Sequence, residues 1–168
     1  SFGGIRWVEP EEPEGVARDF ALGFHAPGRF DRVLDVSECH LLFEGGIDIV
    51  KTARTLALEL KLSAWNQHTH EGCLRHLVLR RGVRTEETLV YVVSSVRDEA
   101  VDVFLERLSA AHPEITTLIH GVNAHVADVA TSVERRVIKG PGWITERLSG
   151  IEFRISPESF FQTNTLQA

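Results

Sequence analysis

The order of strand-like and helix-like segments in the second half of the chain constrains its fold most. Two runs rich in β-branched residues predict a β-hairpin that turns over 82–87: residues 73–81 and 88–94. Apolar residues then recur at helical spacing: Val101, Phe104, Leu105 and Leu108. Ser95 with Asp98 resembles a capping box for this helix, which must end before Pro113. Residues 115–122 return to a strand pattern.

The first half of the chain predicts a small antiparallel meander followed by a helix. The expected strands are Phe2 to Val8, Ala17 to Phe24 and Arg32 to Val36. A turn is expected at Ala26-Pro27-Gly28, and Ser37 is placed to cap the helix. Gly45-Gly46 is a predicted irregularity near the start of this helix, whose apolar stripe extends to about Leu62. The polar stretch from Trp65 to Gly72 has no period and predicts a loop.

A second hairpin is expected around Ser149-Gly150, between 143–148 and 151–155. Together these segments predict an α+β fold of mainly antiparallel sheets, with two or more helices packed on one face. The predicted division of the chain has three parts: a meander-plus-helix subdomain over 1–62, an α+β sandwich subdomain over 73–155 and a junction over 156–168.

The composition fits a domain of a cytoplasmic protein. The chain has 168 residues, of which 43% are hydrophobic and 25% are charged, enough for a compact core. No apolar run approaches the roughly 20 residues that a membrane span needs, and nothing signals export. Cys39 and Cys73 are far apart in sequence and form no C-x-x-C pair, which favours a reducing compartment. A single disulfide between them is the alternative. The opening Ser1-Phe2-Gly3-Gly4 has the pattern of the middle of an extended segment, so we expect this sequence to begin inside a longer protein.

The charge pattern leaves two candidate nucleic-acid contacts on an acidic chain. The formal net charge is -6, whereas phosphate binding needs clustered Lys and Arg. One basic cluster comprises Arg75, Arg80, Arg81 and Arg84, and the other comprises Arg135, Arg136 and Lys139. The alternative for each residue is a solvated strand end or turn.

The segment from Ile155 to Asn164 contains the most specific candidate site. Pro157 restrains Ser156 to an extended backbone and ends the strand. Phe160 and Phe161 cannot share one face, so if one ring packs inward the other can stack on a nucleobase, an interaction of about 1–3 kcal/mol. The amide of Gln162 suits either a uracil edge or a cofactor. Alternatively, both rings belong to the core and Gln162 caps a helix.

This run, Ile155-Ser156-Pro157-Glu158-Ser159-Phe160-Phe161-Gln162-Thr163-Asn164, resembles the signature of the RumA/TrmA-type RNA uracil-5-methyltransferases. Weaker matches are Gly23-Phe24-His25 and Leu74 to Arg80. In that family the signature precedes the methyltransferase domain. The resemblance implies an intact protein that transfers a methyl group from S-adenosylmethionine to carbon 5 of a uridine, an RNA modification expected in 23S ribosomal RNA. It also implies that this chain is the central RNA-facing domain, inactive by itself, because the catalytic cysteine lies in the absent domain.

The resemblance assigns roles to particular residues. Gln162 is expected to bind the cofactor, and Phe160 to lie beside the target base. We also expect weak, salt-sensitive RNA binding through the signature, including Asn164. From the charge pattern, the same kind of binding is expected of three arginines in the β-rich segments: Arg75, Arg80 and Arg81. We assign no catalytic residue to this chain.

Metal binding is expected only in the context of a longer protein. Some family members hold a [4Fe-4S] cluster through three N-terminal cysteines and one at the position of Cys39, so Cys39 is either a fourth ligand in the intact parent or a small buried residue. His68-Thr69-His70 with His76 is the densest histidine group, but it lacks the companions of a zinc site. His120 and His125 are expected to form backbone hydrogen bonds or lie at the surface.

A second function class stays open on sequence grounds, namely a non-catalytic RNA- or protein-binding domain. The acidic net charge and the missing catalytic parts favour it. A parent reading frame that continues into a glycine-rich cofactor loop and a catalytic cysteine would favour the methyltransferase.

Overall fold

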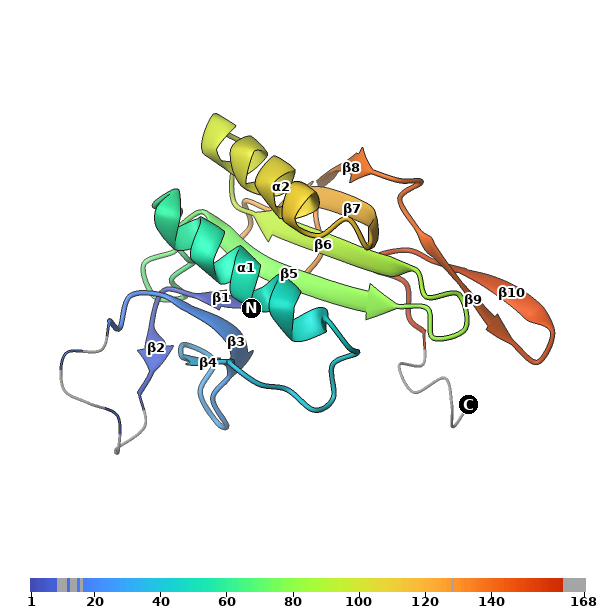
Figure 1. Cartoon of the computed structure of the whole chain (residues 1–168). Coiled ribbons are helices and arrows are strands. Elements are labelled where there is room, and N and C mark those ends of the chain that lie inside the picture. Colours follow the sequence, from blue (N-terminus) through green and yellow to red (C-terminus); the bar gives the residue numbers. More distant parts are fainter. Residues whose placement is uncertain (9–11, 13–14, 16, 128, 162–168) are drawn as a thin grey trace.

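The computed structural model describes residues 1–8, 12, 15, 17–127 and 129–161. These residues form two mixed sheets, a separate β-hairpin and a pair of helices that lie together over one face of the larger sheet (Figure 1). The predicted α+β class is therefore confirmed. In the described part of the chain, neither helix is long and apolar enough to cross a membrane.

The larger sheet has its most buried strand near its middle. Its strands, in spatial order, are β5 (Leu74–Arg81), β6 (Thr88–Ser94), β7 (Ile115–Val122) and β8 (Glu134–Lys139). β5 and β6 form the predicted antiparallel hairpin, and helix α2 (Glu99–Ala111) connects β6 to the parallel strand β7. All residues of β6 are buried because both of its faces are covered.

Strand β8 was not predicted from the sequence. It pairs antiparallel with β7 at the edge of the sheet, and its side chains are exposed or half-buried. Its composition, Glu-Arg-Arg-Val-Ile-Lys, carries charges on both faces and therefore has no clean alternation. The basic cluster of Arg135, Arg136 and Lys139 thus belongs to an edge strand.

The two helices begin in different ways. The Asp98 side chain accepts a hydrogen bond from the Val101 backbone N–H at 2.9 Å, so Asp98 caps α2, while Ser95 donates to the Gly72 carbonyl instead. Helix α1 (Gly46–Glu59) starts after Gly45, whose φ of 80° is left-handed and strained for residues with a side chain. The prediction that Ser37 caps α1 was wrong, because the Gly45-Gly46 pair is the helix start.

The smaller sheet is more complex than the predicted meander. Its spatial order is β1 (Phe2–Gly3), β3 (Ala21–His25), β4 (Val33–Asp35) and β2 (Arg6–Trp7), with β2 parallel to β4. The single expected first strand is divided because the Gly4 backbone N–H donates to the Trp65 carbonyl at 2.7 Å. The turn at Ala26-Pro27-Gly28 is confirmed: Gly28 has a φ of 72° and Arg29 donates to the Ala26 carbonyl at 2.9 Å.

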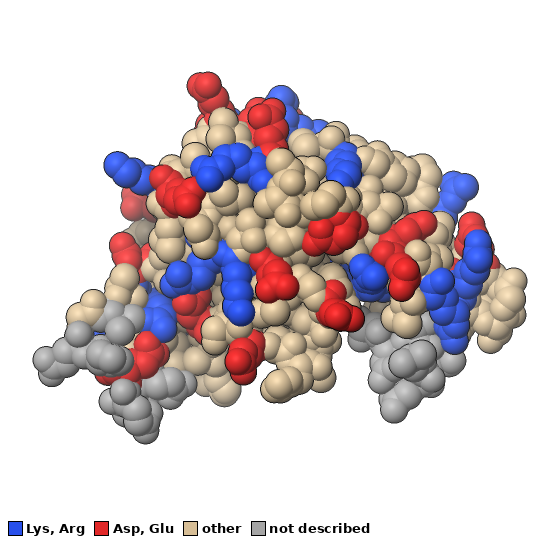
Figure 2. Space-filling model, in the orientation of Figure 1, with Lys and Arg blue, Asp and Glu red and all other residues tan. Residues whose placement is uncertain are grey.

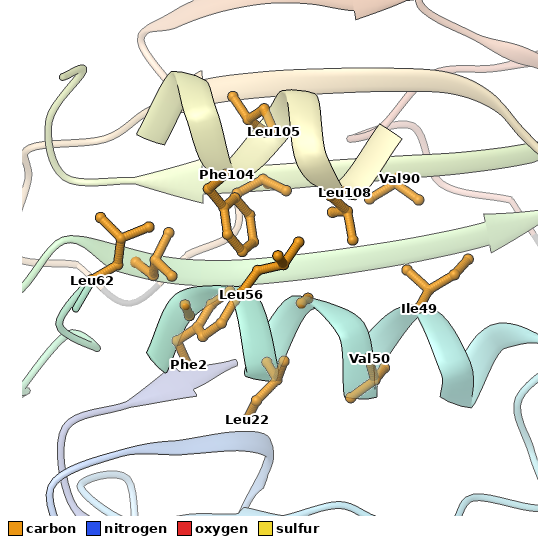
Figure 3. Close-up of a cluster of buried hydrophobic side chains, with 14 of the residues drawn as sticks. Phe2, Leu22, Ile49, Val50, Leu56, Leu62, Val90, Phe104, Leu105 and Leu108 are labelled. Carbon is orange, nitrogen blue, oxygen red and sulfur yellow. The ribbon is translucent and has the colours of Figure 1, made fainter. Parts of the chain in front are cut away.

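One hydrophobic cluster joins the smaller sheet, the helices and the larger sheet (Figure 3). It includes Phe2 and Leu22 from the smaller sheet, Leu56 from α1, and Val90 and Phe104 from β6 and α2. This cluster crosses the predicted boundary between 1–62 and 73–155. The division of the chain into these subdomains stays a prediction.

A second, smaller cluster covers the opposite face of the larger sheet. It contains Leu89, Tyr91, Val93, Ile119, Ile144 and Ile155. The last two come from the predicted hairpin, β9 (Ile144–Leu148) and β10 (Ile151–Ile155), whose two-residue turn has positive φ at Ser149 (51°) and Gly150 (79°). In Figure 1 this hairpin extends away from the helices.

Hydrogen bonds connect the buried His120 side chain of β7 to Arg136 of β8 and Ser94 of β6. Arg136 Nε donates to His120 Nδ1 at 3.1 Å, and His120 Nε2 lies 2.7 Å from Ser94 Oγ, which donates to the Val96 carbonyl. Arg136 also pairs with Asp102 of α2. Because Nδ1 accepts and the serine hydroxyl is already donating, this arrangement requires a neutral imidazole with its proton on Nε2.

Acid should weaken the fold through His120. Burial, with the nearby charge of Arg97, lowers the pKa of His120 from 6.5 to about 4. The unfolded chain therefore binds more protons than the folded chain between these values, and the free energy of unfolding should fall by up to about 3 kcal/mol as the pH drops through this window. Urea denaturation at a series of pH values measures this slope. His120→Gln should flatten it, and an unchanged slope in that variant would contradict the assignment.

Candidate functional site

The segment after β10 forms a compact turn at the face opposite the helices. Pro157 is buried, and the Ser159 hydroxyl accepts from the Ser156 backbone N–H and donates to the Ser156 carbonyl, both at 3.0 Å. The Ser159 N–H also donates to that carbonyl at 3.3 Å. Pro157 thus follows the end of the strand, as the sequence indicates, and Ser159 fixes the turn.

Glu158 holds this turn against the larger sheet. Its carboxylate accepts from the Tyr91 hydroxyl and from the Ser132 backbone N–H, both at 3.1 Å, and lies 3.4 Å from an Arg135 guanidinium nitrogen. Burial, with the adjacent Glu158 charge, raises the pKa of Tyr91 to about 12. The phenol therefore stays protonated and donates to Glu158.

Gly121 makes room for the Tyr91 hydroxyl. A Cβ at this position of β7 would overlap both the Tyr91 hydroxyl and the Ser132 side chain. The absence of a side chain on Gly121 therefore allows Tyr91, from the neighbouring strand β6, to reach Glu158. Tyr91 and Gly121 were not predicted as site residues, whereas Arg135 belongs to one of the two predicted basic clusters. Tyr91, the chain's one tyrosine, lies in a strand whose other apolar residues are aliphatic.

The turn directs its two phenylalanines to different environments. Phe161 packs against the second core cluster, with its ring centroid 5.7 Å from that of Phe153. Phe160 is 91% exposed. One ring is therefore packed and the other is available to a ligand, which is the arrangement that the sequence argument requires for base stacking. Gln162 and Asn164 lie outside the described residues.

Arg75 is a structural residue and not the RNA contact that the sequence predicts. Its side chain is fully buried, donates to the Asn123 and Ala127 carbonyls at 2.8 and 2.7 Å, and also donates to the His125 carbonyl. Its guanidinium carbon lies 4.2 Å from the centroid of the Trp65 ring. A guanidinium in this position orders the loop after β7 and cannot reach a phosphate.

Arg80 and Arg81 point to opposite faces of β5. Arg80 is paired in register with Leu89 of the second core cluster, whereas Arg81 is paired with Thr88, donates to its hydroxyl at 2.8 Å and lies over Phe43. Of these two, Arg80 shares the face of the junction. The predicted arginine cluster is thus divided between the two faces of the sheet. On the face of the molecule drawn in Figure 2, basic and acidic side chains are interspersed.

The cysteines and histidines do not assemble a metal site. Among the described residues, no group of three or more His, Cys, Asp or Glu side chains could hold a metal ion. Cys39 is half-buried with a free thiol, and a cluster would need three thiolates that this chain lacks, so its role as a fourth ligand stays a prediction. Burial raises the pKa of Cys73 to about 11, which keeps this thiol protonated.

Comparison with known proteins shows that the chain is similar to RNA methyltransferases. No protein-family model matches the chain. An uncharacterized RNA methyltransferase of Chlorobaculum tepidum is 45% identical over 153 residues, which cover 90% of this chain and 32% of that protein. Another from Bacteroides thetaiotaomicron is 32% identical over 174 residues, covering 100% of this chain and 38% of that protein. This chain is a homologue of RNA methyltransferases.

A solved structure agrees with this assignment. The crystal structure of Pyrococcus abyssi tRNA (uracil-54, C5)-methyltransferase in complex with S-adenosyl-L-homocysteine matches with a TM-score of 0.70 and 28% identity, over 88% of this chain and 35% of that chain. The resemblance read from the sequence is therefore confirmed. The chain spans about a third of the length of the relatives that it matches.

Glu158→Gln should loosen the turn that presents Phe160. The neutral amide weakens the bonds from Tyr91, Ser132 and Arg135, so we expect the free energy of unfolding to fall by about 1 kcal/mol. Chymotrypsin should also cleave faster at Phe161, as measured by mass spectrometry of timed digests. The matched control is Glu152→Gln, whose carboxylate is exposed on the adjacent hairpin and should change stability by less than about 0.5 kcal/mol. Equal effects in both variants would contradict the anchoring role.

Proposed function

We propose that the chain is the RNA-facing central domain of an S-adenosylmethionine-dependent RNA uridine C5-methyltransferase. The observation that carries this proposal is the junction turn, which Glu158 holds against the sheet and which leaves Phe160 exposed. The RNA methyltransferase relatives and the S-adenosyl-L-homocysteine complex of the Pyrococcus abyssi enzyme support the reaction class. We further propose a cytoplasmic location, where such an RNA substrate would be found.

The proposed role of Phe160 follows from its exposure and from the face of the sheet on which it lies. An unpaired base that leaves its stack can regain stacking on an exposed aromatic ring. Arg80 lies on the same face of the sheet and can contact the backbone phosphates. Since the formal net charge is -6, such local contacts would have to provide RNA affinity in place of a broad basic surface.

The cofactor would supply an electrophilic methyl group, and the cysteine nucleophile would come from the remainder of a longer protein. Gln162 is the residue of this chain that we propose would contact the cofactor. We make no such proposal for Cys39, whose expected partner is a [4Fe-4S] cluster of the longer protein.

The substrate proposed from the sequence is 23S ribosomal RNA, whereas the structural neighbour is named as a tRNA methyltransferase. Competition between a ribosomal RNA fragment and a transfer RNA stem-loop for the chain would separate these substrates. Preference for the transfer RNA would exclude the ribosomal proposal but leave the reaction class unchanged.

Phe160→Ala should weaken RNA binding between about 5- and 150-fold, because it removes one stacking contact of about 1–3 kcal/mol. Fluorescence anisotropy with a labelled single-stranded oligouridine at low salt measures the dissociation constant. Leu41→Ala is the matched control, since Leu41 is 97% exposed and has no proposed role. Equal affinities of the wild type and Phe160→Ala would contradict the role of this ring and favour the alternative of a protein-binding domain.

The chain alone should transfer no methyl group from S-adenosylmethionine to RNA. It has no glycine-rich cofactor loop, and the half-buried Cys73 thiol stays protonated at neutral pH. Incorporation of tritium from labelled S-adenosylmethionine into RNA tests this expectation, with a full-length relative as the positive control. Turnover by the chain itself would mean that a catalytic centre lies within these residues.

A further inference from the structure

We propose that Phe30 and His68 form a second stacking site for an unpaired nucleobase of RNA. The site lies where the β3–β4 turn meets the loop over 66–71, apart from the junction that carries Phe160. This proposal rests on the proposed function, because its ligand is the same RNA.

Two exposed rings from segments distant in sequence meet at this site. Phe30 is 71% exposed, and its ring centroid lies 5.8 Å from that of His68 with an interplanar angle of 57°. The His68 side chain is itself 55% exposed. An isolated exposed phenylalanine needs no explanation, but a pair of solvent-facing rings in mutual contact forms an aromatic surface large enough for a base.

A buried carboxylate fixes the two rings relative to each other. The Asp31 side chain is 6% exposed and lies 3.2 Å from His68 Nε2. It also accepts from Arg29 Nε at 2.9 Å and Arg29 Nη2 at 2.8 Å. The Arg29 guanidinium holds the pKa of Asp31 well below its usual range, so the carboxylate stays charged. Asp31 therefore ties the β3–β4 turn that carries Phe30 to the loop that carries His68.

The loop that carries His68 is ordered by its own hydrogen bonds. The Asn66 side-chain oxygen accepts from the backbone N–H groups of His68 and Thr69 at 2.9 and 3.2 Å. The Asn66 N–H donates to the Glu71 carbonyl at 2.8 Å. Because these bonds lie within the loop itself, binding a base here would lose little conformational entropy.

The charges around the rings favour a nucleic acid over a protein partner. Arg29 and Arg32 share the single Asp31 carboxylate, and their side chains are 43% and 40% exposed. The two arginines and the Asp31 carboxylate together carry one net positive charge beside the aromatic surface. A stacking ring with adjacent guanidinium groups suits a base and its phosphates, whereas the centre of a protein interface is depleted in charged residues.

The test compares replacements of Phe30 that differ in their aromatic face. The 168-residue chain is titrated with a fluorescein-labelled oligouridine about 16 nucleotides long. Phe30→Leu keeps the apolar side chain but loses the π-face, so the dissociation constant should rise at least about fivefold. Phe30→Trp retains a stacking face and should bind within about twofold of the wild type. Circular dichroism of each variant confirms folding, which exposed substitutions should preserve.

Phe24→Leu is the matched control, since Phe24 is 60% exposed on the strand that precedes the turn. An equal loss in Phe24→Leu and Phe30→Leu, or no loss in Phe30→Leu, would overturn the second site. If Phe160→Ala weakens binding while Phe30→Leu does not, the second site fails and the proposed function stands. If the wild-type chain binds no RNA, both fail. Losses in both single variants that add in the double variant are the expected result for two independent sites.

Discussion

Strand β6 is the constraint on which the rest of the structure depends, because its two faces belong to two different cores. Val90 and Val92 point into the cluster under the helices, while Leu89, Tyr91 and Val93 point into the cluster beneath the β9–β10 hairpin. A strand covered on both faces is typically apolar on both, and from Leu89 to Val93 β6 has the most continuous apolar run of the larger sheet. Both layers are therefore positioned relative to this one strand.

Tyr91 connects this packing constraint to the candidate site. Its ring contributes to the second core cluster, and its hydroxyl passes over Gly121 to donate to Glu158. The position of the junction turn is thus set by a core residue and not by surface contacts alone. The same logic applies to Arg75, whose buried charge is used to order the loop after β7 and is lost to any ligand.

The sequence predicted elements well where periodicity and turn chemistry agreed. The β5–β6 hairpin, α2 and the β9–β10 hairpin each have a clear pattern, and the last also has a matching turn at Ser149-Gly150. The predicted capping box of α2 was wrong in its cap, because Asp98 and not Ser95 caps the helix. Prediction from the sequence failed where tertiary contacts decided the outcome. Gly4 bonds to the Trp65 carbonyl and divides the first strand, and the charged β8 forms only because β7 offers it an edge.

The site was predictable in part for the same reason. The separation of Phe160 from Phe161 follows from the alternation of adjacent side chains, whereas the anchoring of Glu158 by Tyr91 requires strands far apart in sequence to meet. The arginines could not be sorted from the sequence because sequence proximity does not reveal direction. Arg80 and Arg81 are neighbours on opposite faces, and Arg75, where the β5–β6 register shifts, is buried.

The hydrophobic cluster that crosses from the smaller sheet to α2 has a mechanical consequence. The two core clusters, which share strand β6, pack the smaller sheet, whose β3–β4 turn carries Phe30, and the hairpin that precedes the Phe160 turn into one body, so the distance between the two turns is constrained. The spacing of the two rings would therefore set a required distance between two bases of a bound RNA. An RNA that engages both rings would have to present two unpaired bases at that fixed interval, so selection among RNAs would depend on their folded shape as well as on the identity of the modified base.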